Sequence, residues 1–275
     1  NLSLMVGIYP YILKLLQSPA EDIKQTLVAI WASIIGFDAS CRQELIREKA
    51  QAYFIQFFQS VSAPPAQRCM AMFVLAEICN KFKEGQQTCL HLGLHRVCTT
   101  ALTEDKVLQS SSLKQWICLC LYKLCDDSPW AKYLCITEAG HTHLYTLLAD
   151  PDPTIRVVAV LALGEMFGAS SLSSSTSASG SIGSSSGGRG GPSSAVGNNR
   201  GTNGQKLDER DLREAELQLA WQLLDCCTDG SVSVRLETIY ALSKCLLLPA
   251  HIECIKLVAR CVRACTKARQ ETAAA

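Results

Sequence analysis

The chain has 275 residues, of which 48% are apolar, and its 26 basic and 25 acidic side chains leave a formal net charge of +1. This length and apolar content can supply a large buried core in one or two domains. The near-neutral charge excludes a global field that would attract nucleic acid or an anionic membrane. Because the first residue is Asn1, we expect a longer natural chain or a processed product.

The predicted elements are all helices. Apolar residues recur over residues 23 to 35 with the steps of a single helical stripe, and the same steps recur over 155 to 167. Two further helices are predicted over 212 to 226 and 252 to 262, and Asp208 is the expected N-cap of the first of them. No stretch alternates with period two for long enough to predict a sheet. The sequence therefore predicts an all-α protein.

A basic residue recurs at the start of one helix after another, each time after a turn and before an apolar helix. The spacings between successive members are 44, 46, 42 and 79 residues. Such a fixed period is typical of repeat proteins. The five members, which we call the anchor residues, are Lys24, Arg68, Lys114, Arg156 and Arg235.

The last spacing is long because it contains residues 169 to 206, which include 13 Ser and 9 Gly in 38 residues. Such a composition cannot bury enough apolar area to offset the entropy of ordering, so we predict a disordered insertion. Without it the last spacing falls to 41 residues, and the period is restored. The insertion therefore interrupts one repeat and does not separate two domains.

Two helices per 40 to 47 residues indicate HEAT or armadillo repeats. Such a unit cannot bury both apolar faces alone, so successive units stack into a rod. We predict an α-solenoid of about five repeats, with helical repeats over 1–168, the insertion over 169–206 and the same solenoid over 207–275.

Acidic residues accompany two of the anchor residues. Asp150 lies six residues before Arg156, and Asp229 lies six residues before Arg235. We interpret the anchors and these two acids as a structural ladder that joins the turns of adjacent repeats, because Asp and Arg can form charge-assisted hydrogen bonds. The alternative is a row of ligand-binding cations along a groove.

The segment CLHLGLHRVC contains the residues that most resemble a metal site. On one continuous helix His91, His95 and Cys98 would share a face and could hold zinc. Gly93 lies between them, where the other repeats place a loop, so we expect core cysteines and exposed histidines instead. No local signature of a cysteine protease, a redox CxxC motif or a phosphate-binding loop is present. The sequence predicts neither catalysis nor a cofactor nor a metal.

The 15 cysteines lie mostly among Leu, Ile and Val, where free Cys behaves as a small apolar residue. Their odd number and the lack of a leader-like segment predict a reducing, cytoplasmic location. The longest uncharged apolar run, residues 157 to 164, is too short to span a bilayer. The serines of the insertion are hypothetical phosphorylation sites, and its GGRGG segment is interpreted as linker in preference to an RNA contact.

Several segments resemble the helical-repeat region of the Raptor family of TOR complex 1 scaffold subunits, in the right order along the chain. The most specific are LKQWICLCLYKL at 113–124 and PWAK at 129–132. Others are GIYPYILKLLQSP, IWASIIGFDASC, GQQTCL, LYTLLADPDPTIRVVAVLALGEMFG and DGSVSVRLETIYALS. The resemblance covers nearly all of the predicted helical chain.

The resemblance implies a non-catalytic scaffold that contacts TOR kinase and docks Rag-type GTPases, which recruit the complex to lysosomal or vacuolar membranes. Around the turns, Lys114, Trp116 and Asp150 are the residues we select as partner contacts. An importin-like transport adaptor is the alternative, although neither Trp31 nor Trp116 is followed four residues later by the Asn that such adaptors use.

Overall fold

The computed structural model describes residues 21–60, 62–170 and 209–246, and the single residues 12, 14, 15, 259 and 263. In these ranges every element is helical, which confirms the predicted fold class. The predicted cap Asp208 and most of the predicted helix 252–262 lie outside the described residues. The elements are α3 (Glu21–Phe37), η1 (Ala39–Cys41), α4 (Arg42–Arg47), α5 (Ala50–Gln59), α6 (Pro65–Cys79), α7 (Lys83–His91), α8 (Leu94–Ala101), α9 (Asp105–Leu108), α10 (Ser111–Cys125), α11 (Pro129–Thr137), α12 (Gly140–Tyr145), η2 (Thr146–Ala149), α13 (Pro153–Glu165), α15 (Glu209–Asp225), η3 (Cys226–Thr228) and α16 (Val232–Leu246).

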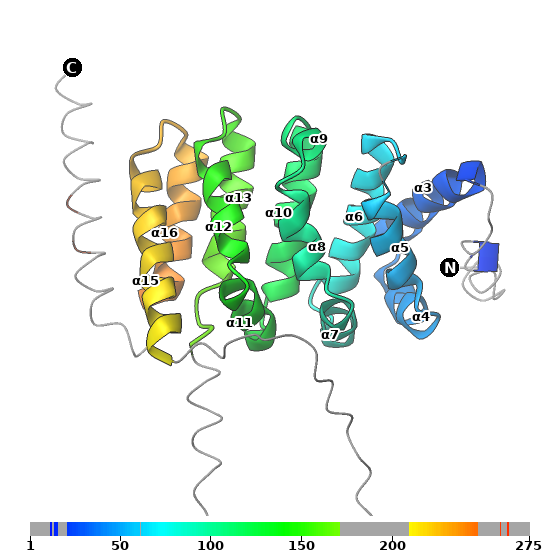
Figure 1. The fold of residues 1–275 in the computed structure, drawn as a ribbon, viewed down its shortest axis with the longest axis horizontal. Helices are drawn as coiled ribbons and strands as arrows, with labels where there is room; N and C mark the ends of the chain where they lie inside the picture. Colours follow the sequence, from blue (N-terminus) through cyan, green and yellow to red (C-terminus); the bar gives the residue numbers. More distant parts are fainter. Residues whose placement is uncertain are drawn as a thin grey trace, which may run out of the picture.

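The helices form two layers of repeated units that lie side by side in chain order (Figure 1). The first layer contains the five long helices that carry the anchor residues, and each packs directly on the next. The second layer covers them with helices that touch one another less extensively. This is the predicted α-solenoid, because each unit buries its apolar faces against its neighbours. The first layer consists of α3, α6, α10, α13 and α16.

Local sequence fixes where the first-layer helices begin and end. Pro65 and Pro153 occupy the first turns of α6 and α13, where a missing N–H costs nothing. The Ser110 side chain caps α10 by accepting from the amide of Leu113. After α6 and α10 the chain enters the left-handed region at Lys81 (φ 51°) and Asp127 (φ 50°), which stops the helix.

The second helical segment is broken by a residue in the left-handed conformation in three successive units. Lys49 (φ 55°), Gly93 (φ 77°) and Ala139 (φ 55°) adopt the left-handed conformation between the two halves. These residues are 44 and 46 residues apart, so the break follows the repeat period. Each of these units therefore has three helices, as in armadillo repeats. Of the three, only Gly93 is a usual residue for this conformation, and the loop predicted there is confirmed.

The core runs along the whole rod between the two layers. The residue seven positions after each anchor is buried in every unit, and its exposed fraction is 4% or less. Burying a large apolar side chain contributes about 1.5 to 3 kcal/mol, so this row stabilises each junction. The five residues are Trp31, Leu75, Leu121, Leu163 and Leu242.

The solenoid continues across the predicted insertion. Helix α16 packs on α13 as α13 packs on α10. The approach is so close that a Cβ on Gly164 would lie 3.0 Å from the Cα of Ala241. Ala169 and Ser170, which composition assigned to the insertion, are buried. The packed chain therefore extends two residues further than the sequence indicated.

Candidate protein-binding surfaces

Two edges of the rod carry bonds between units. The turn edge contains the turns that precede the first-layer helices and lies at the top of Figure 1. The carbonyl edge contains the carboxyl ends of the same helices, near α7 and α11 at the bottom of the figure. The predicted partner contacts Lys114, Trp116 and Asp150 lie on the turn edge.

Arg156 shows how an anchor residue is used. Its Nε and Nη2 donate to the two carboxylate oxygens of Asp229 in the next unit, at 2.7 and 2.9 Å. Its Nη1 donates to the carbonyl of Asp150 in its own turn, at 2.7 Å. Asp229 in turn accepts from the amide of Ser231, which orders the turn. The guanidinium therefore joins two turns, while the acid six residues before it supplies only a backbone carbonyl.

The preceding junction uses the same arrangement with a lysine. Lys114 forms an ion pair with Asp150 of the next unit, and the exposed side-chain fractions are only 9% and 8%. Asp150 also accepts from the amide of Asp152 at 2.9 Å. Removing one partner of such a buried ion pair would leave an unpaired buried charge, which is strongly destabilising. The structure thus brings together two residues that are 36 positions apart.

The partner of Arg68 was missed by sequence reasoning. Its Nη2 donates to Glu104 at 3.1 Å, and its Nε donates to the carbonyl of Phe58 at 2.7 Å. Glu104 lies ten residues before Lys114, whereas the position six residues before Lys114, where two other repeats carry Asp, is occupied by Leu108. The signal was present as an acid in the turn, but it is shifted because this turn contains the additional short helix α9.

The remaining anchors lie at the ends of the described rod. Arg235 forms the same bond within its own turn as Arg156 does, since its Nη1 donates to the carbonyl of Asp229 at 2.6 Å. The chain beyond residue 246, apart from residues 259 and 263, lies outside the described residues. Lys24 occupies the equivalent position in α3 and is partly buried.

The electrostatics at Arg156 follow from its geometry. The bond to Asp229 raises the pKa of the guanidinium, so it stays charged. The same bond, followed by that from the Ser231 amide, lowers the pKa of the Asp229 carboxyl against the opposing effect of burial. This pair is therefore fully ionised near neutral pH.

The carbonyl edge has a second row of bonds, which the sequence analysis did not find. Side chains at the start of second-layer helices donate to backbone carbonyls at the end of the next first-layer helix. Gln86 Nε2 donates to the carbonyls of Lys123 and Asp126 at 2.9 and 2.7 Å. Arg42 Nη1 donates to the carbonyl of Asn80 at 2.5 Å, and Lys132 Nζ donates to the carbonyl of Phe167 at 3.3 Å. These three donors satisfy carbonyls that a helix end leaves without partners.

Two buried carboxylates connect the chain before the insertion with the helices that follow it. Glu216 on α15 is fully buried and accepts from the amides of Gly168 and Ser170, both at 3.0 Å, and from the Ser170 hydroxyl at 2.8 Å. Glu165 on α13 accepts from Lys132 at 3.0 Å and from Lys244 on α16. The chain on both sides of the insertion is therefore fixed by charge-assisted bonds.

The three selected partner contacts lie together at the turn edge but differ in availability. Lys114 and Asp150 are occupied by each other. Trp116 is half-buried and meets the ring of Phe73 edge-on, with 4.9 Å between ring centroids. Trp116 therefore belongs to an aromatic pair that joins α6 to α10.

The CLHLGLHRVC segment does not form a metal site. Gly93 separates α7 from α8, so His91 lies on one helix and His95 and Cys98 on the next. No group of three metal-ligating side chains occurs among the described residues. The expectation of exposed histidines is wrong for His95, whose exposed fraction is 4% and whose Nε2 bonds Glu138 at 3.0 Å.

The cysteines of the described chain pack in the core, with one exception of intermediate exposure. Burial raises the pKa of Cys41 to about 11 and that of Cys118 to about 12. A thiol with so high a pKa carries almost no thiolate at neutral pH and is a poor nucleophile. These residues therefore act as packing groups.

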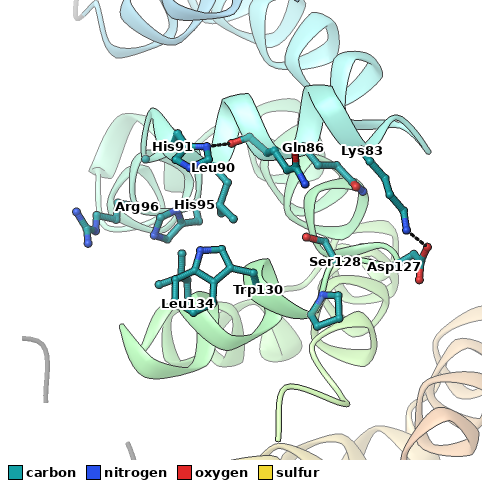
Figure 2. Close-up of a pocket in the computed structure, with 13 residues that line it drawn as sticks. Lys83, Gln86, Leu90, His91, His95, Arg96, Asp127, Ser128, Trp130 and Leu134 are labelled. Carbon is teal, nitrogen blue, oxygen red and sulfur yellow. Dashed lines mark hydrogen bonds and ion pairs between the residues drawn. The ribbon is translucent and has the colours of Figure 1, made fainter. Parts of the chain in front are cut away.

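A cleft opens between the second-layer helices of adjacent units (Figure 2). It measures about 690 Å³ and lies between α7 and α8 on one side and α11 on the other. Trp130, with an exposed fraction of 52%, lines it beside Leu90 and Leu134. In the sequence Trp130 is recognisable only as part of the PWAK motif, and no cleft was predicted there. In the described ranges no helix is both long and apolar enough to span a bilayer.

Comparison with known proteins identifies relatives. No family model matches the chain. It is 43% identical over 168 residues to the protein raptor homolog of Dictyostelium discoideum, covering 61% of this chain and 11% of that protein. It is 36% identical over 264 residues to regulatory-associated protein of TOR 2 of Oryza sativa subsp. japonica, covering 94% of this chain and 17% of that protein. The chain thus spans less than a fifth of these relatives.

Solved structures agree with the sequence relatives. The crystal structure of Chaetomium thermophilum Raptor matches with a TM-score of 0.66 and 28% identity, over 90% of this chain and 20% of that one. A designed armadillo repeat protein in complex with the peptide (KR)4 matches with a TM-score of 0.66 over 95% of this chain and 90% of that one, but at 15% identity, so it shows the fold alone. The chain is therefore related to the Raptor proteins in both sequence and structure, and it corresponds to part of their helical-repeat region.

Proposed function

We propose that the chain is a non-catalytic scaffold segment of a Raptor-type subunit of TOR complex 1. The observation that carries this proposal is the identity of 36% to a regulatory-associated protein of TOR over 94% of the chain. A yeast relative is named as a target of rapamycin complex 1 subunit, which supports the same complex. The rigid stack of units supports a geometric mechanism, in which partners are held at fixed distances and their effective concentration rises without chemistry.

The proposed partners are TOR kinase and Rag-type small GTPases. The resemblance of the chain to the Raptor family supports both. Through such partners a cytoplasmic protein would be recruited to the lysosomal or vacuolar surface without inserting into the membrane. An importin-like adaptor is less well supported, because the relatives at 43% and 36% identity carry Raptor or TOR names.

We place the partner contact at the turn edge around Lys114, Trp116 and Asp150. Because Lys114 and Asp150 neutralise each other, their role there is to hold the turn in shape. More exposed neighbours then make the direct contact with the partner protein. One of them is Leu108 on α9, whose exposed fraction is 40%. The ladder of anchor residues fixes the spacing of successive turns and so the shape of this edge.

The test uses the full-length protein, tagged and purified from its own cells. We expect TOR kinase to copurify in stoichiometric amount. Recovery of importins without TOR kinase would overturn the proposal.

A matched pair of variants tests the turn edge. Leu108→Arg places a charge on α9 and is expected to lower GTPase binding at least tenfold, whereas Thr142→Arg on the exposed surface of α12 is expected to leave it unchanged. Equal binding by both variants would move the contact away from the turn edge and leave the TOR assignment intact.

A further inference from the structure

The cleft between α7, α8 and α11 is far from the proposed contact at the turn edge (Figures 1 and 2). Its volume of about 690 Å³ lies within the range of roughly 300 to 1,000 Å³ that is typical of binding pockets. It also lies at a junction between units, so its shape depends on how the two units stack. These features make it a candidate for recognition that the scaffold role does not yet use.

The apolar part of the cleft is built around Trp130. One face of the indole stacks on Tyr133, with 5.2 Å between ring centroids and 9° between planes. Figure 2 shows the indole on the α11 side of the cleft, across from Leu90 and His95 on the other helices. The stack on Tyr133 holds the indole in one orientation, so it offers a preformed flat surface.

The charged side chains at the rim are already paired. Lys83 forms an ion pair with Asp127 at 3.0 Å. Arg96 forms two bonds with Glu138, at 2.6 and 2.7 Å, and His95 adds a third to the same carboxylate. Burial lowers the pKa of His95, so its ring is neutral near pH 7. A charged ligand would lose hydration here without gaining a free opposite charge, whereas a neutral apolar group meets no such cost.

Another exposed apolar side chain lies beside the lining residues in the chain. Leu92, in the turn between α7 and α8, has an exposed fraction of 44%. Half-exposed Trp with Tyr and Arg is the composition that carries most of the energy in protein interfaces. Trp130, its neighbour Tyr133 and Arg96 are such residues, so the cleft fits a side chain of a protein partner.

We propose that this cleft receives a neutral aromatic side chain from a partner protein, which stacks against Trp130. The inference rests on the proposed scaffold function and adds a second docking point on the opposite edge from the first. The aromatic ring supplies the apolar area, and the charged side chains Lys83 and Arg96 at the rim are already paired, so recognition depends on shape and ring stacking.

Methyl NMR of the 275-residue chain tests the chemistry with amino-acid amides as probes. N-acetyl-L-tryptophanamide and N-acetyl-L-tyrosinamide are expected to shift the methyl resonances of Leu90 and Leu134, whereas the lysine and aspartate analogues are not. Trp130→Ala is expected to weaken this binding at least tenfold, and Trp130→Phe is expected to retain part of it. Trp221→Ala is the matched control and is expected to bind as the unaltered chain does.

Tighter binding of a charged analogue, no binding of the aromatic amides, or binding that survives Trp130→Ala would each overturn the inference. Unchanged methyl resonances of the buried Leu27 and Leu219 show that Trp130→Ala is folded. If that variant unfolds, the comparison of Trp130→Phe with Trp221→Ala decides the result.

A second arm tests whether the aromatic ring comes from a protein. Gln87 is exposed at the rim of the cleft and is replaced by a photoreactive benzoyl-phenylalanine in the full-length protein. We expect a crosslink to a polypeptide segment that contains an aromatic residue, and we expect Trp130→Ala to remove it. A crosslink that persists in Trp130→Ala, or that contains no polypeptide, contradicts the inference, while retained TOR kinase in the same sample keeps the proposed function.

Discussion

The two edges of the rod are held by different chemistry. At the turn edge, carboxylates in one unit bind cations of the unit before it, as in the pairs Lys114–Asp150 and Arg156–Asp229. At the carbonyl edge, side chains such as Gln86 bind backbone carbonyls of the next unit. The first row depends on the identity and ionisation of both partners, whereas in the second one partner is present in any sequence. The turn-edge pairs should therefore respond to pH and to single charge changes more strongly than the bonds of Gln86 do.

The sharpest test of this difference is Asp150→Ala. The change leaves the buried ammonium of Lys114 without its carboxylate, so we expect the free energy of unfolding to fall by about 3 to 5 kcal/mol. Urea unfolding followed by circular dichroism measures it. The double variant Lys114→Met, Asp150→Leu should recover most of the loss, and a double variant as unstable as the single one would show that the pair is not the cause.

Glu216→Ala tests a buried carboxylate at the carbonyl edge. Here the edge uses a buried carboxylate, and its removal leaves two backbone amides and a hydroxyl without an acceptor. We expect a loss of about 2 to 4 kcal/mol and faster amide exchange at Gly168 and Ser170. Glu216→Gln retains one acceptor oxygen and should lose less. Unchanged exchange at these two amides would contradict the role assigned to Glu216.

The pH dependence of the turn edge can be read at Asp229. Its pKa is lowered in the folded chain, chiefly by Arg156, so its stabilisation is present above the unfolded-state pKa of about 3.9 and is lost as pH falls through the folded value. Asp229→Asn should therefore cost about 1.5 to 3 kcal/mol at pH 7 and progressively less below pH of about 4. Thermal unfolding of both proteins from pH 7 to pH 2 measures this. A difference that stays constant down to pH 2 would rule out the ionised pair.

Gln86→Leu probes the neutral bonds of the carbonyl edge. The change removes two hydrogen bonds to the carbonyls of Lys123 and Asp126, so we expect a loss of about 1 to 2 kcal/mol. Since no charge is involved, the loss should be the same at pH 7 and pH 4 in urea unfolding. A loss that changes with pH between these values would break the distinction between the edges.

Lys83→Ala should have the smallest effect. Lys83 and Asp127 form an ion pair, but their side chains have exposed fractions of 72% and 81%. Such pairs contribute roughly 0 to 1 kcal/mol, so we expect a change below about 0.5 kcal/mol in the unfolding free energy. A loss comparable with that of Asp150→Ala would show that burial is not what separates strong pairs from weak ones here.

Much of the fold could be predicted because its signals are periodic. The stripe of residues 23 to 35 and the anchor spacing near 44 residues follow from helix geometry and from units that must stack. The break at Gly93 was also readable, because glycine favours the left-handed conformation that the structure shows there. The equivalent break at Lys49 was not readable, because lysine does not favour the left-handed conformation that the structure shows there.

The site residues divide in the same way. The acids Asp150 and Asp229 are visible in the sequence because each also accepts a hydrogen bond from the backbone amide two residues later, which is a local feature of turns. Glu104 was missed because α9 shifts the turn, and Glu216 because its acceptor role depends on amides 46 and 48 residues away. The cleft at Trp130 could not be predicted from the sequence, because it forms only when two units pack against each other.

The sequence by itself determined that the chain is a stack of helical units with one insertion, because apolar periodicity and repeat length are local properties of the chain. Tertiary structure decided which side chains bond across the junctions, where the helices break, and which surface remains open. These depend on the distance and angle between units, and many side chains together set that geometry.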